Sequence, residues 1–319
     1  MILQTDKSAE KRTSRSITEA LGLPREATAA KRRVRLLLWE GWDQRVRACC
    51  RTLAAHSGVE VWSMPSQELE GGIALLDPEL VRGAWCERRG SVVDGIPTTP
   101  VEISAAALAV GLVDGCVGGV ATSTGDVLRA GIRYVGLGAG VKTVSVAFVV
   151  RGVSDRIVLL ADCGAVIEPQ VGQLVDIAAA SVRTWTRIGR GEPRVAFLAS
   201  STKGSNRDPV NSKVQQALLT FREAMPHVAA EGELQGDAAL LPEIAIGKGA
   251  SRWSEPANIL IMPSLNAGNI AVKLLQRLGN CESVAITQGF RRPFYDLSRS
   301  ASVADALATS WICADECAG

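Results

Sequence analysis

The chain has 319 residues, with 35 lysine and arginine residues against 33 aspartate and glutamate residues, so its formal net charge is +2. So small a net charge excludes the strongly basic surface of many nucleic-acid-binding proteins, and we expect no nucleic-acid partner. The longest apolar run, 105–113, is far too short to cross a bilayer, so we expect no membrane partner. The length suits one large or two medium α/β domains.

Histidine and cysteine are not placed like the ligands of a metal site. His56 and His227 lie outside any polar cluster, and the eight cysteines stand singly or as the pair Cys49-Cys50, without CxxC spacing. This argues against a zinc site and against a Ser-His-Asp hydrolase. We therefore expect no bound metal ion. We expect the cysteines to be buried thiols in a reducing cytoplasm. The N-terminus also lacks the apolar segment and cleavage site of a secretory signal.

Residues 1–33 are polar and basic, with few large apolar side chains. This composition is typical of a disordered or frayed arm. The alternative is a short amphipathic helix over 16–23, with a thin apolar stripe of Ile17, Leu21 and Leu23. Such a helix would dock onto a shell or another partner protein.

From residue 34 onward, short apolar runs alternate with amphipathic segments. The apolar runs predict strands at 34–38, 59–62, 115–120, 143–150, 156–161, 194–199 and 258–262. The amphipathic segments predict helices at 44–56, 103–112, 126–134, 171–187, 209–224 and 267–278. The proline-containing stretch 63–102 is expected to be irregular, and the two strands around Gly152 to form a hairpin. The alternation predicts an α/β fold with a mainly parallel sheet covered on both faces.

Near the C-terminus, a hydroxyl, a cation and a carboxylate fall within eight residues, where a loop is expected to become a helix. They are Ser298, Arg299 and Asp305, and Ser302 is expected to cap the helix. Such a cluster can bind an oxyanion and take up a proton in one place. By itself it is also typical of a solvated turn before a capped helix.

Other polar and glycine-rich segments follow one another in a recognisable order. They are Glu40-Gly41-Trp42-Asp43-Gln44-Arg45, a segment at 119–131, Ser201-Thr202-Lys203-Gly204-Ser205, Gly232-Glu233-Leu234-Gln235 with Asp237, and Pro263-Ser264-Leu265-Asn266-Ala267-Gly268-Asn269. With Asp296-Leu297-Ser298-Arg299 at the end, the chain resembles the phosphate acetyltransferase (phosphotransacetylase) family from about residue 34 to 312. The stretch 127–142 is most similar to the ethanolamine- and propanediol-utilisation branch.

The resemblance implies two α/β domains with mainly parallel sheets, of the isocitrate/isopropylmalate-dehydrogenase type. The first domain would be built from 34–139 plus 289–319, the second from 140–288, with the active site in the cleft between them. The implied activity is reversible transfer of an acetyl group between coenzyme A and phosphate, by direct attack in a ternary complex. The alternatives are a phosphate butyryltransferase or other short-chain specificity, and a non-catalytic regulatory or scaffold relative. A dehydrogenase is disfavoured because no convincing GxGxxG block occurs.

The resemblance also implies roles for the C-terminal cluster. Arg299 would bind the phosphoryl group of acetyl phosphate, and Ser298 would hydrogen-bond the oxygen that becomes negative in the transition state. Asp305 would take the proton from the thiol of coenzyme A. The family usually has Gly-Cys where this chain has Ser300-Ala301, which would strain Ser300 if the position needs a positive φ.

Further residues are implied as contacts to coenzyme A or phosphate. They are Arg88, Arg129, Cys163, Thr202, Lys203, Gly204, Ser205, Asn266, Gly268 and Asn269. Each also has an ordinary structural explanation, such as a solvated helix arginine or an asparagine that caps a helix. The match of Arg88 is loose, since Arg89 fits as well. Cys163 is expected to be a thiol that is not a nucleophile, because no histidine lies close in sequence.

The resemblance implies no permanently bound cofactor, since coenzyme A is a substrate. It implies a homodimer in the cytoplasm. A bacterial microcompartment, reached through residues 1–33 by contact with shell or cargo, is a further expectation.

A second departure from relatives is Trp39, where proline is common before the acidic-Gly pair.

Overall fold

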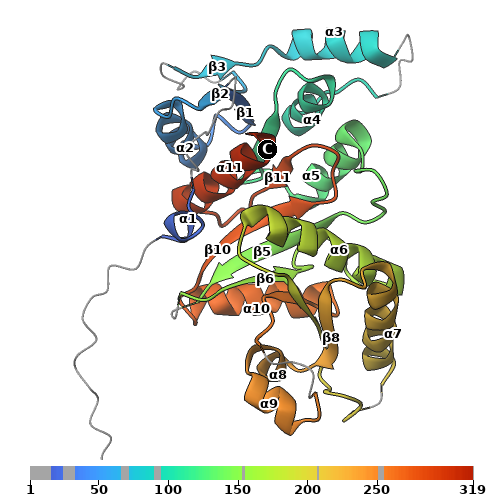
Figure 1. The fold of residues 1–319 in the computed structure, drawn as a ribbon. Coiled ribbons are helices and arrows are strands. Elements are labelled where there is room, and N and C mark those ends of the chain that lie inside the picture. Colours follow the sequence, from blue (N-terminus) through green and yellow to red (C-terminus); the bar gives the residue numbers. More distant parts are fainter. Residues whose placement is uncertain are drawn as a thin grey trace, which may run out of the picture.

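The computed structural model describes residues 16–23, 33–65, 72–89, 95–152, 155–206, 208–250 and 255–318. Two sheets organise these residues, one in the upper and one in the lower half of Figure 1. The first sheet has the order β11-β4-β1-β2-β3 and is parallel throughout. Its strands are β1 (Val34–Leu38), β2 (Val59–Ser63), β3 (Ala74–Leu75), β4 (Gly115–Gly118) and β11 (Phe294–Asp296).

The second sheet has the order β10-β5-β6-β9-β7-β8, in which β6, β9, β7 and β8 run parallel. β5 pairs antiparallel with β6 and β10, so the hairpin predicted around Gly152 is confirmed. The strands are β5 (Ser145–Arg151), β6 (Ile157–Ala161), β7 (Arg194–Leu198), β8 (Ala229–Leu234), β9 (Ile259–Ile261) and β10 (Glu282–Gln288). The predicted α/β fold with mainly parallel sheets is confirmed.

Helices cover both sheets (Figure 1). They are α1 (Ile17–Ala20), α2 (Gln44–Ala54), α3 (Pro78–Arg89), α4 (Pro100–Val110), α5 (Thr124–Ala130), α6 (Val171–Ile188), α7 (Pro209–Ala224), α8 (Gly236–Leu240), α9 (Pro242–Gly247), α10 (Leu265–Arg277) and α11 (Val303–Ala318), with a π-turn at Gly131–Val135 after α5. No helix among these is long and apolar enough to span a membrane.

One of the three buried apolar clusters among the described residues joins the two sheets. This cluster of buried side chains includes Leu36 of the first sheet, Val149 of the second, and Ile312 of α11. The chain crosses between the sheets where the Gly138 amide donates to the Gly289 carbonyl at 3.0 Å. The domain boundaries expected from the sequence, 139/140 and 288/289, fall at this crossing, and the division into two domains stays a prediction.

Residues 16–23 belong to the folded core rather than to a frayed arm. Ser16 caps α1 in a capping box with Glu19. The apolar stripe of Ile17, Leu21 and Leu23 is buried against the chain itself, next to α11 and β10. This stripe is therefore already covered, whereas residues 1–15 and 24–32 lie outside the described residues.

The prediction that 63–102 is irregular is wrong, because this stretch contains β3, α3 and the first turn of α4. Pro78 and Pro100 are each the first residue of a helix, where a missing N–H breaks no intrahelical bond. Asp77 accepts a hydrogen bond from the Glu79 amide at 2.9 Å, and Thr99 caps α4. β8, β10 and β11 were not predicted, since buried polar residues such as Glu231 interrupt the apolar pattern.

Candidate functional site

The segments implied by the resemblance follow the C-terminal ends of parallel strands in the two sheets. In the first sheet, β11 ends at Asp296 and leads into the loop 297–302. In the second sheet, β6, β7, β8 and β9 lead into 162–166, 199–206, 235–237 and 262–264. The helix α10, which follows β9, contacts the loop 297–302, where the Nζ of Lys273 lies 3.4 Å from the hydroxyl of Ser298.

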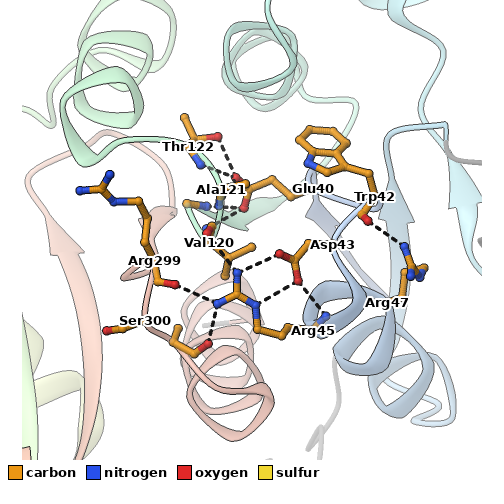
Figure 2. Close-up of polar contacts among 12 residues, drawn as sticks. Glu40, Trp42, Asp43, Arg45, Arg47, Val120, Ala121, Thr122, Arg299 and Ser300 are labelled. Atoms are coloured by element: carbon orange, nitrogen blue, oxygen red, sulfur yellow. Dashed lines mark hydrogen bonds and ion pairs between the residues drawn. The ribbon is translucent and has the colours of Figure 1, made fainter.

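The backbone of Arg299 is hydrogen-bonded to the protein, whereas its side chain has no partner among the described residues. Its guanidinium is exposed and makes no hydrogen bond or ion pair with the described residues, whereas its carbonyl oxygen accepts from Arg45 at 2.9 Å. Figure 2 shows the side chain extending away from Arg45. The neighbouring Ser298 hydroxyl lies 3.0 Å from that of Ser300. A solvent-facing planar cation beside a hydroxyl can receive an anion with two oxygens.

Asp305 caps the helix that follows the loop. Its Oδ2 accepts from the amide of Ser302 at 2.8 Å and from the Ser302 hydroxyl at 2.9 Å, and the Asp305 amide donates back to Ser302 at 3.2 Å. Ser298 and Asp305 line one cavity of about 300 Å³, together with residues of α1, α10 and β10. Both residues therefore border a common space, which Arg299 does not line.

The two departures from the family pattern fit the structure without backbone strain. Ser300 does not adopt a positive φ, and the Ala301 amide closes the turn by donating to the Ser298 carbonyl at 2.8 Å. Trp39 is buried and stacks on Phe294 at 5.3 Å. Its ring occupies the space over Gly118, where a Cβ would lie 2.3 Å from the indole. Trp39 and Gly118 are thus complementary in shape.

Glu40 organises the loop between β4 and α5. Its buried carboxylate accepts hydrogen bonds from four successive amides, Gly119 to Thr122, and from the Thr122 hydroxyl, at 2.7 to 2.9 Å (Figure 2). Gly119 turns the chain there with φ +116, and a Cβ on it would lie 2.3 Å from Asp296 Oδ1. A carboxylate that neutralises a run of amides replaces the anion such a turn would otherwise attract.

Asp296 is a buried carboxyl just before the loop 297–302. Its Oδ2 accepts from the Thr124 hydroxyl at 2.7 Å, and its Oδ1 has no hydrogen-bond partner. Burial raises the pKa of Asp296 to about 7; the hydrogen bond from Thr124 opposes the rise, the charge of Glu40 adds to it, and that of Arg299 opposes it. Asp296 is therefore a carboxyl whose charge changes near neutral pH.

The amides of residues 202–206 all donate to acceptors of the protein, so this loop presents no row of unengaged amides to an anion. The amides of Thr202, Lys203 and Gly204 donate to Ser205 Oγ, the Glu233 carbonyl and Glu233 Oε1. Those of Ser205 and Asn206 donate to Thr202 and Ser201. The ammonium of Lys203 is paired with the buried Glu231 at 2.6 Å.

The start of α10 packs against the end of β6. A Cβ on Gly268 would lie 2.2 Å from the Asp162 carbonyl, so only glycine fits there. Asn269 donates to the carbonyl of Cys163 at 3.1 Å, while Asn266 is exposed. Burial and the charge of Asp162 raise the pKa of the Cys163 thiol well above its ordinary value. This thiol is therefore protonated at neutral pH.

The structure does not bring Arg88 to the loop 297–302. Arg88 lies on α3, which follows the edge strand β3, whereas β11 forms the opposite edge of that sheet. Its guanidinium donates to the Ala109 carbonyl. Arg129, on α5, is exposed and pairs with Asp126 one helical turn earlier. Arg89 has no described side chain.

Sequence reasoning missed the supporting residues Glu40, Arg45 and Lys273. The block at 40–45 is part of the resemblance, but the sequence assigns it no role. Nothing in one sequence pairs it with loops some 80 and 250 residues away. No group of three or more histidine, cysteine, aspartate or glutamate side chains able to hold a metal ion occurs in the part of the chain that the structure describes.

Comparison with known sequences decides the family. The profile of the family described as phosphate acetyl/butaryl transferase matches residues 92–314. The chain belongs to this family. A phosphate acetyltransferase of Paracoccus denitrificans is 32% identical over 295 residues, which is 85% of this chain and 91% of that protein. The family prediction from the sequence is confirmed.

Another relative, a phosphate acetyltransferase of Acetivibrio thermocellus, is 40% identical over 64% of this chain, and the match spans only 64% of its own length. Among solved structures, the EutD phosphotransacetylase from Staphylococcus aureus superposes with a TM-score of 0.83 at 28% identity, covering 95% of this chain and 100% of that one. A branched-chain phosphotransacylase from Enterococcus faecalis shares the fold, with a TM-score of 0.69 at 17% identity, covering 89% of this chain and 99% of that one.

Proposed function

We propose that the chain is a phosphate acetyltransferase that catalyses acetyl-CoA + phosphate ⇌ CoA + acetyl phosphate. The observation that carries the proposal is the free, exposed guanidinium of Arg299, one residue after Ser298, which borders one cavity together with Asp305. Family membership and the phosphate acetyltransferase relatives support the same reaction.

In the proposed mechanism the thiol of coenzyme A attacks acetyl phosphate directly. Asp305 accepts the thiol proton, the thiolate sulfur bonds to the carbonyl carbon, and the carbon–oxygen bond to phosphate breaks with its electron pair going to phosphate. Arg299 binds the phosphoryl oxygens in a fork, which stabilises the leaving charge. Ser298 donates to the carbonyl oxygen as it becomes negative, and the nearby Lys273 ammonium adds positive potential there.

The remaining implied contacts stay proposals. Approach to phosphate from the second sheet is proposed for Thr202, Gly204 and Ser205. Contact with coenzyme A or phosphate is proposed for Asn266, Gly268 and Asn269, and contact with coenzyme A for Arg129. Support for these rests on the resemblance together with their place at the strand ends. The two-domain division with a substrate cleft is proposed on the same basis.

An assay of thioester formation tests the proposal. Coenzyme A is mixed with acetyl phosphate or with butyryl phosphate, and the thioester absorbance is followed. We expect acetyl transfer to be the faster reaction. Faster butyryl transfer would assign the alternative specificity. The two specificities can differ by a few apolar side chains in the acyl pocket, because one methylene of the substrate changes the binding free energy by only about 1–3 kcal/mol. No thioester from either substrate would favour a non-catalytic relative and overturn the proposal.

We also propose a homodimer in the cytoplasm, with residues 1–33 as the segment that contacts a microcompartment shell or cargo. The family resemblance supports this, and because the apolar stripe of 16–23 is covered by the chain itself, residues 1–15 are the part that a truncation removes without opening the core. Light scattering would measure the dimer. Co-sedimentation of full-length and 16–319 proteins with a shell protein would test the arm, and equal sedimentation of the two would refute its role.

A further inference from the structure

Arg45, the second residue of α2, uses every N–H of its guanidinium on the protein. The Nε and Nη2 donate to the carboxylate of Asp43 at 3.0 and 2.8 Å. Nη2 also donates to the Val120 carbonyl at 3.1 Å, and Nη1 donates to the carbonyls of Arg299 and Ala301 at 2.9 and 3.0 Å (Figure 2). These five bonds use up the five donors of a guanidinium.

The contacts of Arg45 join three segments that are far apart in the sequence. Asp43 is the N-cap of α2 and accepts from the Arg45 amide at 2.8 Å, so the guanidinium is anchored to a helix end. Val120 belongs to the loop that Glu40 holds, and Arg299 and Ala301 belong to the loop after β11. Arg45 thus fixes the backbone on both sides of Ser300 without touching the Arg299 side chain.

We propose that Arg45 is a positioning residue for acyl transfer, which sets the backbone of Arg299 so that its free guanidinium meets the phosphoryl group. The inference rests on the proposed function, in which Arg299 is the residue that touches substrate. A planar fork is suited to the task because it holds two carbonyls in a fixed relation, which a lysine ammonium on a flexible stem cannot do.

The physical consequence concerns the rate more than substrate affinity. A displacement of about 1 Å at a catalytic group can lower a rate about 10²-fold, because the reacting atoms lose their alignment. Coenzyme A does not contact Arg45 in this scheme. Loss of Arg45 is therefore expected to lower kcat, with little change in KM for coenzyme A.

The deciding variant is Arg45→Gln, with Arg47→Gln as the matched control on the same helix. Arg47 donates to the carbonyls of Gly41 and Trp42, in the turn that precedes α2, at 3.4 and 2.8 Å, and to neither Arg299 nor Ala301. We expect kcat of Arg45→Gln to fall about 10- to 100-fold, with KM for coenzyme A changed less than about threefold. Arg47→Gln should keep wild-type kcat, and circular dichroism should show both variants folded.

A double-mutant cycle separates positioning from general stability. The second arm of the cycle adds Arg45→Gln to Arg299→Gln and is measured at raised enzyme concentration. In this background Arg45→Gln should lower kcat by a much smaller factor than it does in the wild-type protein, because the side chain that Arg45 positions is gone. Equal losses in both backgrounds would overturn the inference. Should Arg45→Gln not fold, Arg45→Lys becomes the deciding variant: a several-fold loss of kcat at unchanged KM supports positioning, and wild-type kcat refutes it.

Failure of the inference can be told from failure of the proposed function. If the wild-type protein forms no thioester, the proposed function fails and Arg45 has no such reaction to serve. If wild type transfers acetyl groups and folded Arg45→Gln does so at the same rate, the function stands and the positioning role is refuted.

Discussion

Two loops that follow parallel strands, 297–302 after β11 and 201–206 after β7, arrange their polar groups in opposite ways. In 297–302 the backbone is held from outside by Arg45, and the Arg299 guanidinium is left free. In 201–206 the amides are satisfied within the loop and by Glu233, and the Lys203 ammonium is paired with Glu231. Both loops resemble family blocks, but only the first presents a free cation.

The second loop is stabilised around a buried carboxylate. Glu233 accepts from the Gly204 amide at 2.6 Å, from Ser201 at 2.8 Å and from Gln215 at 2.8 Å. Burial opposes ionisation, but these hydrogen bonds hold the pKa of Glu233 below its ordinary value. The Glu233 carboxylate engages the Gly204 amide, and the other amides of 202–206 donate to further acceptors of the protein, so an anionic substrate finds no unengaged amide among them. Anion binding by this chain should thus depend on side chains more than on backbone nests.

The largest expected effect is from Arg299→Gln. Loss of a cation at developing charge typically lowers the rate about 10²–10³-fold, and the exposed side chain should leave the fold intact. Steady-state thioester formation measures the rate, with Arg190→Gln, an exposed arginine after α6, as the control. Turnover near wild type in folded Arg299→Gln would remove Arg299 from the mechanism.

Asp305→Asn should lower the rate about 10²-fold at pH 7, as expected for loss of a general base. As pH rises toward the thiol pKa of about 8.5, free thiolate accumulates and partly replaces the base. The ratio of wild-type to variant rates should therefore shrink between about pH 7 and 9. A ratio independent of pH would assign Asp305 only to the capping of α11.

Asp296→Asn tests the buried carboxyl beside the first loop. Because its native pKa is raised to about 7, the folded protein keeps a proton that the unfolded chain releases above its ordinary pKa of 3.8. This group therefore makes the protein less stable as pH rises between those values, by up to about 1.4 kcal/mol per pH unit. The stability of Asp296→Asn relative to wild type, from urea unfolding, should increase between pH 5 and pH 7 and then level off. A constant difference would show that Asp296 does not titrate in this range.

The smallest effect is expected from Lys203→Met, the counterpart of Arg299→Gln in the second loop. The Lys203 ammonium is engaged by Glu231, which Arg222 also contacts at 3.1 Å. KM for phosphate should therefore change by less than about threefold, because the lost group does not face substrate. A rise of tenfold or more in that KM would show that the loop rearranges and that Lys203 binds phosphate as the resemblance suggested.

Local sequence patterns were sufficient for many, but not all, of the regular elements of the fold. The helix predicted at 209–224 forms over those residues, because Asp208 caps it and Pro209 opens it. β8 was missed, because Glu231 and Glu233 are charged residues buried in a strand, which the apolar pattern cannot register. The free Arg299 could be named from its motif, but the pairing of Lys203 could not, since Glu231 lies 28 residues away.

The order of the residues by itself determines the alternation of strands and helices, the capped start of α11 and the motif that carries Ser298, Arg299 and Asp305. These depend on contacts within a few residues, such as the Ser302–Asp305 capping box. Only the tertiary structure decides which polar groups remain available. Arg45 and Arg299 are both arginines in or beside family motifs. The guanidinium of Arg45 donates its hydrogen bonds to carbonyls of loops about 75 and 250 residues away, whereas that of Arg299 remains exposed. Hydrogen-bond donors are satisfied by whatever acceptors the fold brings within about 3 Å, and that proximity is a property of the packed chain.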